Sequence, residues 1–267
     1  MPGANQKPIC LITGASSGIG AEFALCAAAD GFDLVLVARR VQGMADVAQR
    51  CERLHNAKVT IFPADLGDPT AARVLCAELR ANRLEVNTLI NNAGVGASGP
   101  VASLTLEHQL NIIQVNVTAL TELTRRLIPA MLQRGTGSVL NVASTAAFLP
   151  GPGMAVYYAS KAYVLSFTEA LAQELQHTNI HVSALCPGPT ATNFGAASGM
   201  SSSKLLKQKG IMMSSPTVAR AGWDGLLRRE RVIVPGIANK LMIQSLRAVP
   251  RALAARISAL LNASADS

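Results

Sequence analysis

Short apolar runs alternate with stretches of helical periodicity along most of the chain. The runs predict six strands, at Ile9–Thr13, Leu34–Val37, Val59–Phe62, Thr88–Asn91, Ser138–Val142 and Ile180–Cys186. The stretches between them predict helices at Ile19–Asp30, Val41–Leu54, Thr70–Ala81, about Leu104 to Gln133, and Val156–Gln176. Strands that are apolar on both faces and separated by helices are typical of a parallel sheet covered on both sides. The pattern therefore predicts one α/β domain over residues 1–267, a Rossmann-like, doubly wound parallel sheet.

Local signals add detail to this pattern. Asp68 and Pro69 predict an N-cap and a first helical position for the third helix. Residues 187–215 are rich in Gly, Pro, Ser, Thr and Met and have poor periodicity. Long loops in compact domains are usually functional, and this loop follows the carboxyl end of a strand, so we expect a lid over a ligand. Its apolar residues favour an apolar substrate: Phe194, Met200, Leu205, Leu206, Ile211, Met212 and Met213.

The C-terminal tail, about residues 237–262, follows a last predicted strand at Arg231–Pro235. It carries a helical stripe of Met242, Leu246, Val249, Leu253, Ile257 and Leu260, with Lys240, Arg247, Arg251 and Arg256 at other positions. Pro250 predicts a break into two helices. Three interpretations stay open: packing on its own domain or a second subunit, contact with an anionic membrane surface, or contact with an acidic carrier or anionic acyl thioester.

Composition and charge narrow the class of protein. Nearly half of the residues are apolar and 15% are charged, which indicates a sizeable core. The net charge of +8 arises from residues 201–267, with 11 basic and 3 acidic side chains. The basic end lacks interleaved aromatic residues, so we expect no nucleic-acid partner. Five cysteines without metal-ligand spacing predict reduced thiols, no metal site and a cytoplasmic protein. No apolar run reaches membrane-spanning length, and the polar start predicts no signal peptide.

A glycine-rich turn, Thr13–Gly20, joins the first predicted strand to the first helix. Backbone amides of such a turn and the following helix N-terminus bind a pyrophosphate. Arg39 and Arg40 follow the second strand, where a carboxylate would bind a ribose 2′-hydroxyl and a guanidinium accepts a 2′-phosphate. Ser17 is placed to add a bond near that phosphate. The sequence therefore predicts NADP(H) as the cofactor.

Further motifs appear in a fixed order along the chain. They are Asp65 after the third strand, Asn91–Gly94 after the fourth, Asn116 in the long helix, Ser144 after the fifth strand, Tyr157-x-x-x-Lys161, and Pro187-Gly188 after the sixth strand. With these motifs the chain resembles the short-chain dehydrogenase/reductase family from about Ile9 to Pro235. It is loosely similar to hydroxysteroid and 3-oxoacyl reductases. The resemblance implies a homodimer or homotetramer formed through the long helix and the Tyr157 helix.

Tyr157 and Lys161 lie four residues apart and so share a helix face. A nearby ammonium favours the phenolate and is expected to lower the pKa of the tyrosine. The resemblance implies that Tyr157 exchanges a proton with the substrate oxygen while Lys161 bonds the nicotinamide ribose. It also implies that Ser144 bonds the substrate oxygen and that Asn116 holds a water linking Lys161 to solvent.

The resemblance further implies a set of cofactor contacts. Asp65, with Leu66 next to it, would meet the adenine, and Asn91 would lie by its ribose. The full set is Gly14, Ser16, Ser17, Gly18, Ile19, Gly20, Arg39, Arg40, Asp65, Leu66, Asn92, Ala93, Gly94, Tyr157, Lys161, Pro187, Gly188, Thr190 and Thr192.

These residues predict an NADPH-dependent oxidoreductase that interconverts a ketone or aldehyde and an alcohol. An apolar, acyl-like or steroid-like carbonyl is the expected substrate. The alternative is a regulator that binds NADP(H) without catalysis, and the presence of both Tyr157 and Lys161 disfavours it.

Overall fold

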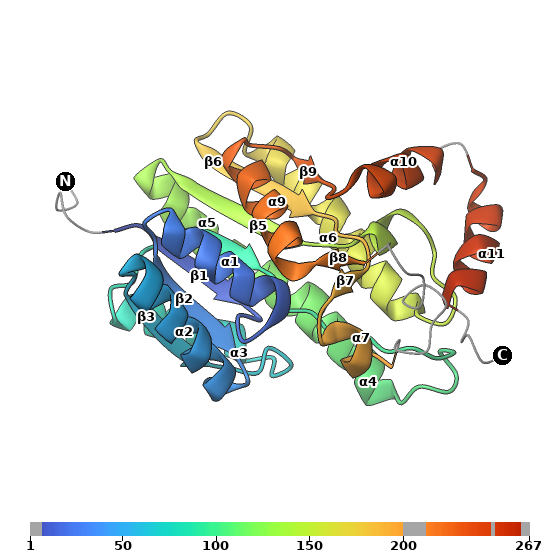
Figure 1. Cartoon of the computed structure of the whole chain (residues 1–267), viewed down its shortest axis with the longest axis horizontal. Coiled ribbons are helices and arrows are strands. Elements are labelled where there is room, and N and C mark those ends of the chain that lie inside the picture. Colours follow the sequence, from blue (N-terminus) through green and yellow to red (C-terminus); the bar gives the residue numbers. More distant parts are fainter. Residues whose placement is uncertain (1–6, 200–211, 247–248, 263–267) are drawn as a thin grey trace.

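A computed structural model describes residues 7–199, 212–246 and 249–262 of the chain (Figure 1). Its main sheet has seven parallel strands in the order β3-β2-β1-β4-β5-β6-β9. The strands are β1 (Ile9–Thr13), β2 (Asp33–Ala38), β3 (Val59–Pro63), β4 (Val86–Asn91), β5 (Gly137–Val142), β6 (Ile180–Leu185) and β9 (Val232–Ile233). The predicted fold class and all six strands predicted before the tail are confirmed; β6 ends one residue earlier than expected, and β9 is three residues shorter than the predicted Arg231–Pro235.

Helices cover both faces of this sheet, each through its own apolar core. On one face lie α1 (Gly18–Ala29), α2 (Val41–His55) and α9 (Ser215–Leu227), with Phe23, Met44 and Trp223 fully buried. On the other lie α3 (Ala71–Ala81), α5 (Leu120–Arg134) and α6 (Ala155–Glu174). Within the described residues, no helix combines the length and apolarity needed to cross a membrane. The arrangement is doubly wound, so the carboxyl ends of the strands meet at one edge.

The long predicted helix is divided into three pieces. These are α4 (Leu106–Ile113), a π-helical turn η1 (Gln114–Ala119) and α5. The predicted site residue Asn116 lies inside η1. Single π-helical turns within α-helices occur frequently at functional sites, and sequence periodicity does not register their extra residue.

The starts of α3 and α9 differ from the sequence-based expectation in an informative way. The third helix begins at Ala71, one residue late, because the Asp68 carboxylate accepts from the Thr70 amide at 2.7 Å in a turn before the helix. The predicted N-cap role of Asp68 is therefore wrong in detail. Helix α9 was not expected, although Ser214 accepts from the Thr217 amide and Pro216 lies in the first turn. That Ser-x-Pro pattern is the signal that would have predicted it.

The described residues of the predicted lid form three short elements. Strands β7 (Thr190–Ala191) and β8 (Met213–Ser214) form a small parallel sheet, and α7 (Phe194–Ala197) follows β7. The apolar lid residues Met200, Leu205, Leu206 and Ile211 lie outside the described residues. The predicted boundary at 215 overlaps the start of α9, and the lid role stays a prediction.

The C-terminal tail forms α10 (Ile237–Leu246) and α11 (Arg251–Asn262). Pro250 lies between them as predicted, and its carbonyl accepts from the Leu253 and Ala254 amides in the first turn of α11. The predicted apolar stripe does not face the domain, since Met242, Leu253, Ile257 and Leu260 are exposed. Other side chains face inward instead: Asn239, Ile243, Ala254 and Ser258. This exposure disfavours packing of the stripe on its own domain, and the other interpretations of the tail stay predictions.

All five cysteines are free and buried. Burial raises the pKa of each thiol, most strongly for Cys10 on β1 and for Cys186 after β6, where it rises to about 12. A buried thiol of raised pKa is a poor nucleophile, so the thiols serve as small apolar core groups.

Candidate active site

The predicted functional residues gather at the carboxyl edge of the sheet. The turn after β1 carries Gly14–Gly20, β4 leads into Asn91–Gly94, and β5 leads into Ser144. Tyr157 and Lys161 stand on α6, which begins 13 residues after β5 ends. Strand order reverses between β1 and β4, and open α/β sheets bind ligands at such a crevice.

The glycine-rich turn depends on backbone conformations and spacings that other residues do not accept. Gly14 and Gly18 have φ of +66° and +58°, in the left-handed region. A Cβ on Gly20 would overlap the carbonyl oxygen of Gly14 and the side chain of Asn92. The glycines therefore let the start of α1 approach the neighbouring turn closely, with its free amides at the edge of the sheet.

The motif after β4 braces this turn from the side. The Thr13 hydroxyl accepts from the Asn92 and Ala93 amides at 3.0 and 2.9 Å, and the Asn92 side chain donates to the Thr13 carbonyl at 2.9 Å. Deeper in the sheet, the Asn91 amide donates to Asn141 on β5 and to Thr124 on α5, each at 2.9 Å. Asn91 is thus buried and ties β4 to β5, and its predicted place beside the ribose stays a prediction.

The two arginines after β2 have different partners. Arg40 donates to the Ser17 hydroxyl at 2.7 Å and lies 3.4 Å from the Ser16 hydroxyl. Arg39 lies 3.9 Å from the Asp65 carboxylate, which also accepts from the Gly67 amide. Both arginines are exposed, so each can rearrange toward a ligand. The structure brings Arg40 and Ser17 together, as expected of residues that share a phosphate.

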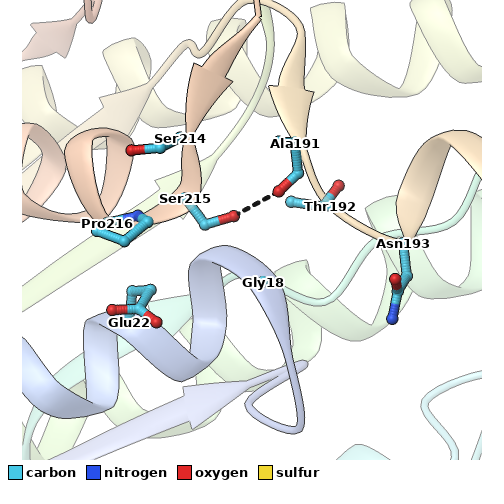
Figure 2. Close-up of a pocket in the computed structure, with 8 residues that line it drawn as sticks. All are labelled: Gly18, Glu22, Ala191, Thr192, Asn193, Ser214, Ser215 and Pro216. Carbon is cyan, nitrogen blue, oxygen red and sulfur yellow. Dashed lines mark hydrogen bonds between the residues drawn. The ribbon is translucent and has the colours of Figure 1, made fainter.

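A pocket of about 370 Å³ opens between the start of α1 and the base of the lid (Figure 2). Gly18 lies on its floor, and the Thr192 methyl would be 3.1 Å from a Cβ at Gly18. The Ser215 hydroxyl, at the start of α9, donates to the carbonyl of Ala191 in β7 at 2.8 Å (Figure 2). Sequence reasoning missed Glu22, Asn193, Ser214 and Pro216, which line this pocket, because they belong to no motif.

Ser144 and Tyr157 form the centre of the predicted catalytic group. Ser144 begins a short 3-10 turn, η2 (Thr145–Phe148), and its hydroxyl accepts from the Ala146 amide at 3.1 Å. Burial raises the pKa of Tyr157 to about 12, while a hydrogen bond with Ser144 acts in the opposite direction. The two hydroxyls are therefore neighbours, and the phenol holds its proton throughout the neutral range.

Lys161 is buried and its ammonium donates to the Val142 carbonyl at 2.8 Å. It lies 5.9 Å from the centroid of the Tyr157 ring. Burial lowers the pKa of Lys161 to about 8. The expected lowering of the pKa of Tyr157 by this ammonium is not found in this structure, because the desolvation of the phenol is the larger effect.

Asn116 connects η1 to the loop after β4. Its side chain accepts from the Val95 amide and donates to the Val95 carbonyl, both at 2.9 Å, and donates to Ser160 at 3.0 Å. Both Asn116 Oδ1 and Lys161 Nζ approach Gly94, at 3.4 and 3.3 Å from the position of an added Cβ. The site thus has Asn116 close to Lys161, and its predicted role with a water stays a prediction.

An apolar cluster surrounds the Tyr157 ring and was only partly expected. The ring centroid of Phe194 in α7 lies 5.3 Å from that of Tyr157, and the Tyr158 ring centroid lies 6.0 Å from it. Ala146, Leu149 and Met154 complete the cluster. Asn239 of α10 lies against the predicted site residue Gly188, since a Cβ there would approach its side chain to 2.6 Å. These contacts arise from chain segments far apart in sequence, so no local signal predicts them.

The site's residues fit a dinucleotide with a 2′-phosphate. The glycine-rich turn lets a pyrophosphate approach the backbone closely and meet the free amides of α1. The Arg40 guanidinium, with the Ser16 and Ser17 hydroxyls, lies beside the turn where a 2′-phosphate would bind. Among the described residues there is no group of three or more side chains suited to hold a metal ion.

Comparisons with known proteins agree with this geometry. A family model described as short chain dehydrogenase matches residues 8–201. The ketoacyl reductase HetN of Nostoc is 35% identical over 180 residues, which cover 67% of this chain and 62% of that protein. A short-chain dehydrogenase from Sphingobium yanoikuyae, solved with NADPH, has a TM-score of 0.80 at 35% identity and covers 91% of this chain and 96% of its own. The bulky-bulky ketone specific alcohol dehydrogenase from Comamonas testosteroni has a TM-score of 0.77 at 31% identity, covering 92% and 96%.

Proposed function

The chain belongs to the short-chain dehydrogenase family, and on that premise we propose that it reduces a ketone or aldehyde to an alcohol with NADPH, using Tyr157 as the general acid. It is an oxidoreductase of this family. The observation that carries the proposal is the group of Ser144, Tyr157 and Lys161 beside the glycine-rich turn, at the carboxyl edge of the sheet.

The choice of NADP(H) is supported by the residues that follow β2. Arg40 is already bonded to Ser17, and no carboxylate follows this strand to bind a 2′-hydroxyl. The NADPH bound to the Sphingobium relative agrees with this choice. When bound, NADPH would supply a hydride to the carbonyl carbon and become NADP⁺.

Tyr157 supplies the proton that balances the hydride. Its raised pKa of about 12 keeps the phenol protonated at neutral pH, so it is able to donate a proton to the carbonyl oxygen as charge develops there. The Ser144 hydroxyl, next to that phenol, donates a hydrogen bond to the same oxygen and stabilises the developing charge. The protonated phenol is the form that the reduction direction requires of a general acid.

Lys161 and Asn116 assist the proton transfer. In its charged form Lys161 stabilises the phenolate that remains after the proton leaves Tyr157. Asn116 fixes the Val95 backbone and, with Gly94, leaves room beside the lysine for a water that returns the proton. Both roles extend the observed contacts and are part of the proposal.

A bulky and largely apolar carbonyl fits the surroundings of Tyr157. The ring is enclosed by Leu149, Met154, Tyr158 and Phe194, none of which is charged. Relatives named ketoacyl reductase and bulky-bulky ketone specific alcohol dehydrogenase agree with this class of substrate.

The exposed apolar side chains Leu106, Leu110 and Ile113 of α4 support a homo-oligomer formed through this helix.

A carbonyl screen with NADPH tests the proposal. We expect the wild type to reduce aryl or acyl ketones, measured as the decrease in NADPH absorbance. In Tyr157→Phe we expect kcat to fall by about 10²- to 10⁴-fold, the usual contribution of a general acid. NADPH affinity, measured by calorimetry, should change less than threefold in that variant. Tight NADPH binding without turnover of any carbonyl would instead favour the non-catalytic regulator.

A further inference from the structure

The last helix of the chain lies against the segment that leads into α6. In Figure 1, α11 is the red helix at the right-hand edge, separated from α6 by 76 residues of chain. The Ser258 hydroxyl donates to the Pro150 carbonyl, and the Asn262 amide donates to the Pro152 carbonyl at 3.0 Å. The Tyr158 hydroxyl donates to Asn262 Oδ1 at 3.0 Å. Asn262 therefore bonds both the segment and α6 itself.

The segment held in this way is part of the wall around Tyr157. Leu149 and Met154, at its two ends, belong to the apolar cluster of Tyr157 and Phe194. Gly151 lies directly beneath the Tyr158 ring, with no room for a Cβ. The Gly153 carbonyl accepts from the Gly99 amide at 2.7 Å, which ties the segment to the loop after β4. A shift of this segment would move the surfaces that face Tyr157.

Hydrogen bonds rather than apolar burial fix the position of α11. Its inward residues Ala254 and Ser258 are 5% and 1% exposed, but both are small. Its large apolar residues point outward, with Leu253 and Leu260 47% and 70% exposed. Apolar area is non-directional, whereas hydrogen bonds to specific carbonyls define one position. The helix is thus held in register by Ser258 and Asn262.

We propose that α11 is a positioning element for substrate selection, in which Ser258 and Asn262 fix residues 150–154 and Tyr158 and thereby shape the wall around Tyr157. The inference rests on the proposed reduction of a bulky carbonyl. Ser258 and Asn262 act through the segment and do not themselves touch the reacting atoms. The tail would then belong to the active site, although it is the part of the chain farthest from the sequence motifs.

Amide hydrogen exchange tests the placement without any need for turnover. The full-length variants are Asn262→Leu, which keeps the branched shape of the side chain and removes both bonds, and Tyr158→Phe, which removes only one hydroxyl. We expect exchange in residues 149–158 to increase at least threefold in Asn262→Leu relative to wild type. The matched control is Arg256→Ala, an exposed residue of α11, in which exchange should stay at the wild-type rate.

Kinetics tests the consequence for the substrate. With propiophenone as the bulky ketone, we expect the KM of Asn262→Leu and of Tyr158→Phe to rise two- to tenfold, the effect of one or two lost hydrogen bonds. With 2-butanone, a small ketone, KM should change less than twofold, and the Kd of NADPH should not change. The KM of the double variant should rise no more than that of the single variant with the larger effect, because both substitutions remove the bond between Tyr158 and Asn262.

The outcomes separate the inference from the proposed function. Unchanged hydrogen exchange in residues 149–158 of Asn262→Leu overturns the inference. Increased exchange together with an equal rise in KM for both ketones also overturns it, because that result would mean general destabilisation. If the wild-type protein reduces no carbonyl, the proposed function fails, and the exchange result still decides whether α11 holds the segment.

Discussion

Arg40→Ala tests the assignment of the 2′-phosphate site most directly. Arg40 is exposed, yet its guanidinium is already held by Ser17 at 2.7 Å and so is oriented before a ligand arrives. Hydrogen bonds to charged groups contribute about 1.5–3 kcal/mol, and solvent screening at an exposed site favours the lower end of that range. About 1.4 kcal/mol corresponds to a factor of ten. We therefore expect the Kd of NADPH to rise about tenfold, and that of NADH, which lacks the phosphate, to stay within twofold.

Calorimetric titration of both cofactors at 50 and 300 mM salt measures this difference. The NADPH preference of the wild type should shrink at the higher salt, because exposed charges are screened. Arg53→Ala is the matched control, since it removes an equal charge from an exposed position in the last turn of α2, the helix that Arg40 precedes. An equal loss for NADPH and NADH in Arg40→Ala, or a similar loss in Arg53→Ala, would refute the reasoning. The first result would mean that Arg40 supports the turn rather than the phosphate.

Three further predictions follow from burial and close packing. The kcat/KM of carbonyl reduction, which reports the free enzyme, should be constant below about pH 7 and fall above pH 8 as Lys161 loses its proton, and a flat profile to pH 10 would contradict its role. Gly20→Ala should cost about 1–3 kcal/mol of stability and lower the Tm by several degrees, because its Cβ meets Gly14 and Asn92, and calorimetry should show weaker NADPH binding; an unchanged Tm would argue against the close contact. Brief treatment of the native protein with a thiol-reactive dye should label fewer than one of the five cysteines, against all five in guanidinium, and rapid native labelling would show that the core opens.

The segments that form the cofactor half of the site could be identified from the sequence, because each is marked by a pattern of residues close together in the chain. Each inner strand is a run of residues buried on both faces, and β1 is buried at every position. The glycine turn and the Tyr157–Lys161 spacing each lie within eight residues. Topology then brings such segments together, because the carboxyl ends of parallel strands share one edge of the sheet.

The sequence by itself therefore determined the parallel α/β sheet, the positions of the strands and the residue types at the site. Only the tertiary structure decided which surfaces surround Tyr157, since Phe194 and Asn262 reach that region from distant parts of the chain. It also decided the protonation behaviour of Tyr157 and Lys161, because desolvation depends on everything packed around a group. Periodicity records which residues are apolar along one helix, but not which face a partner will cover, so only the structure showed that Ala254 and Ser258 form the inward side of α11.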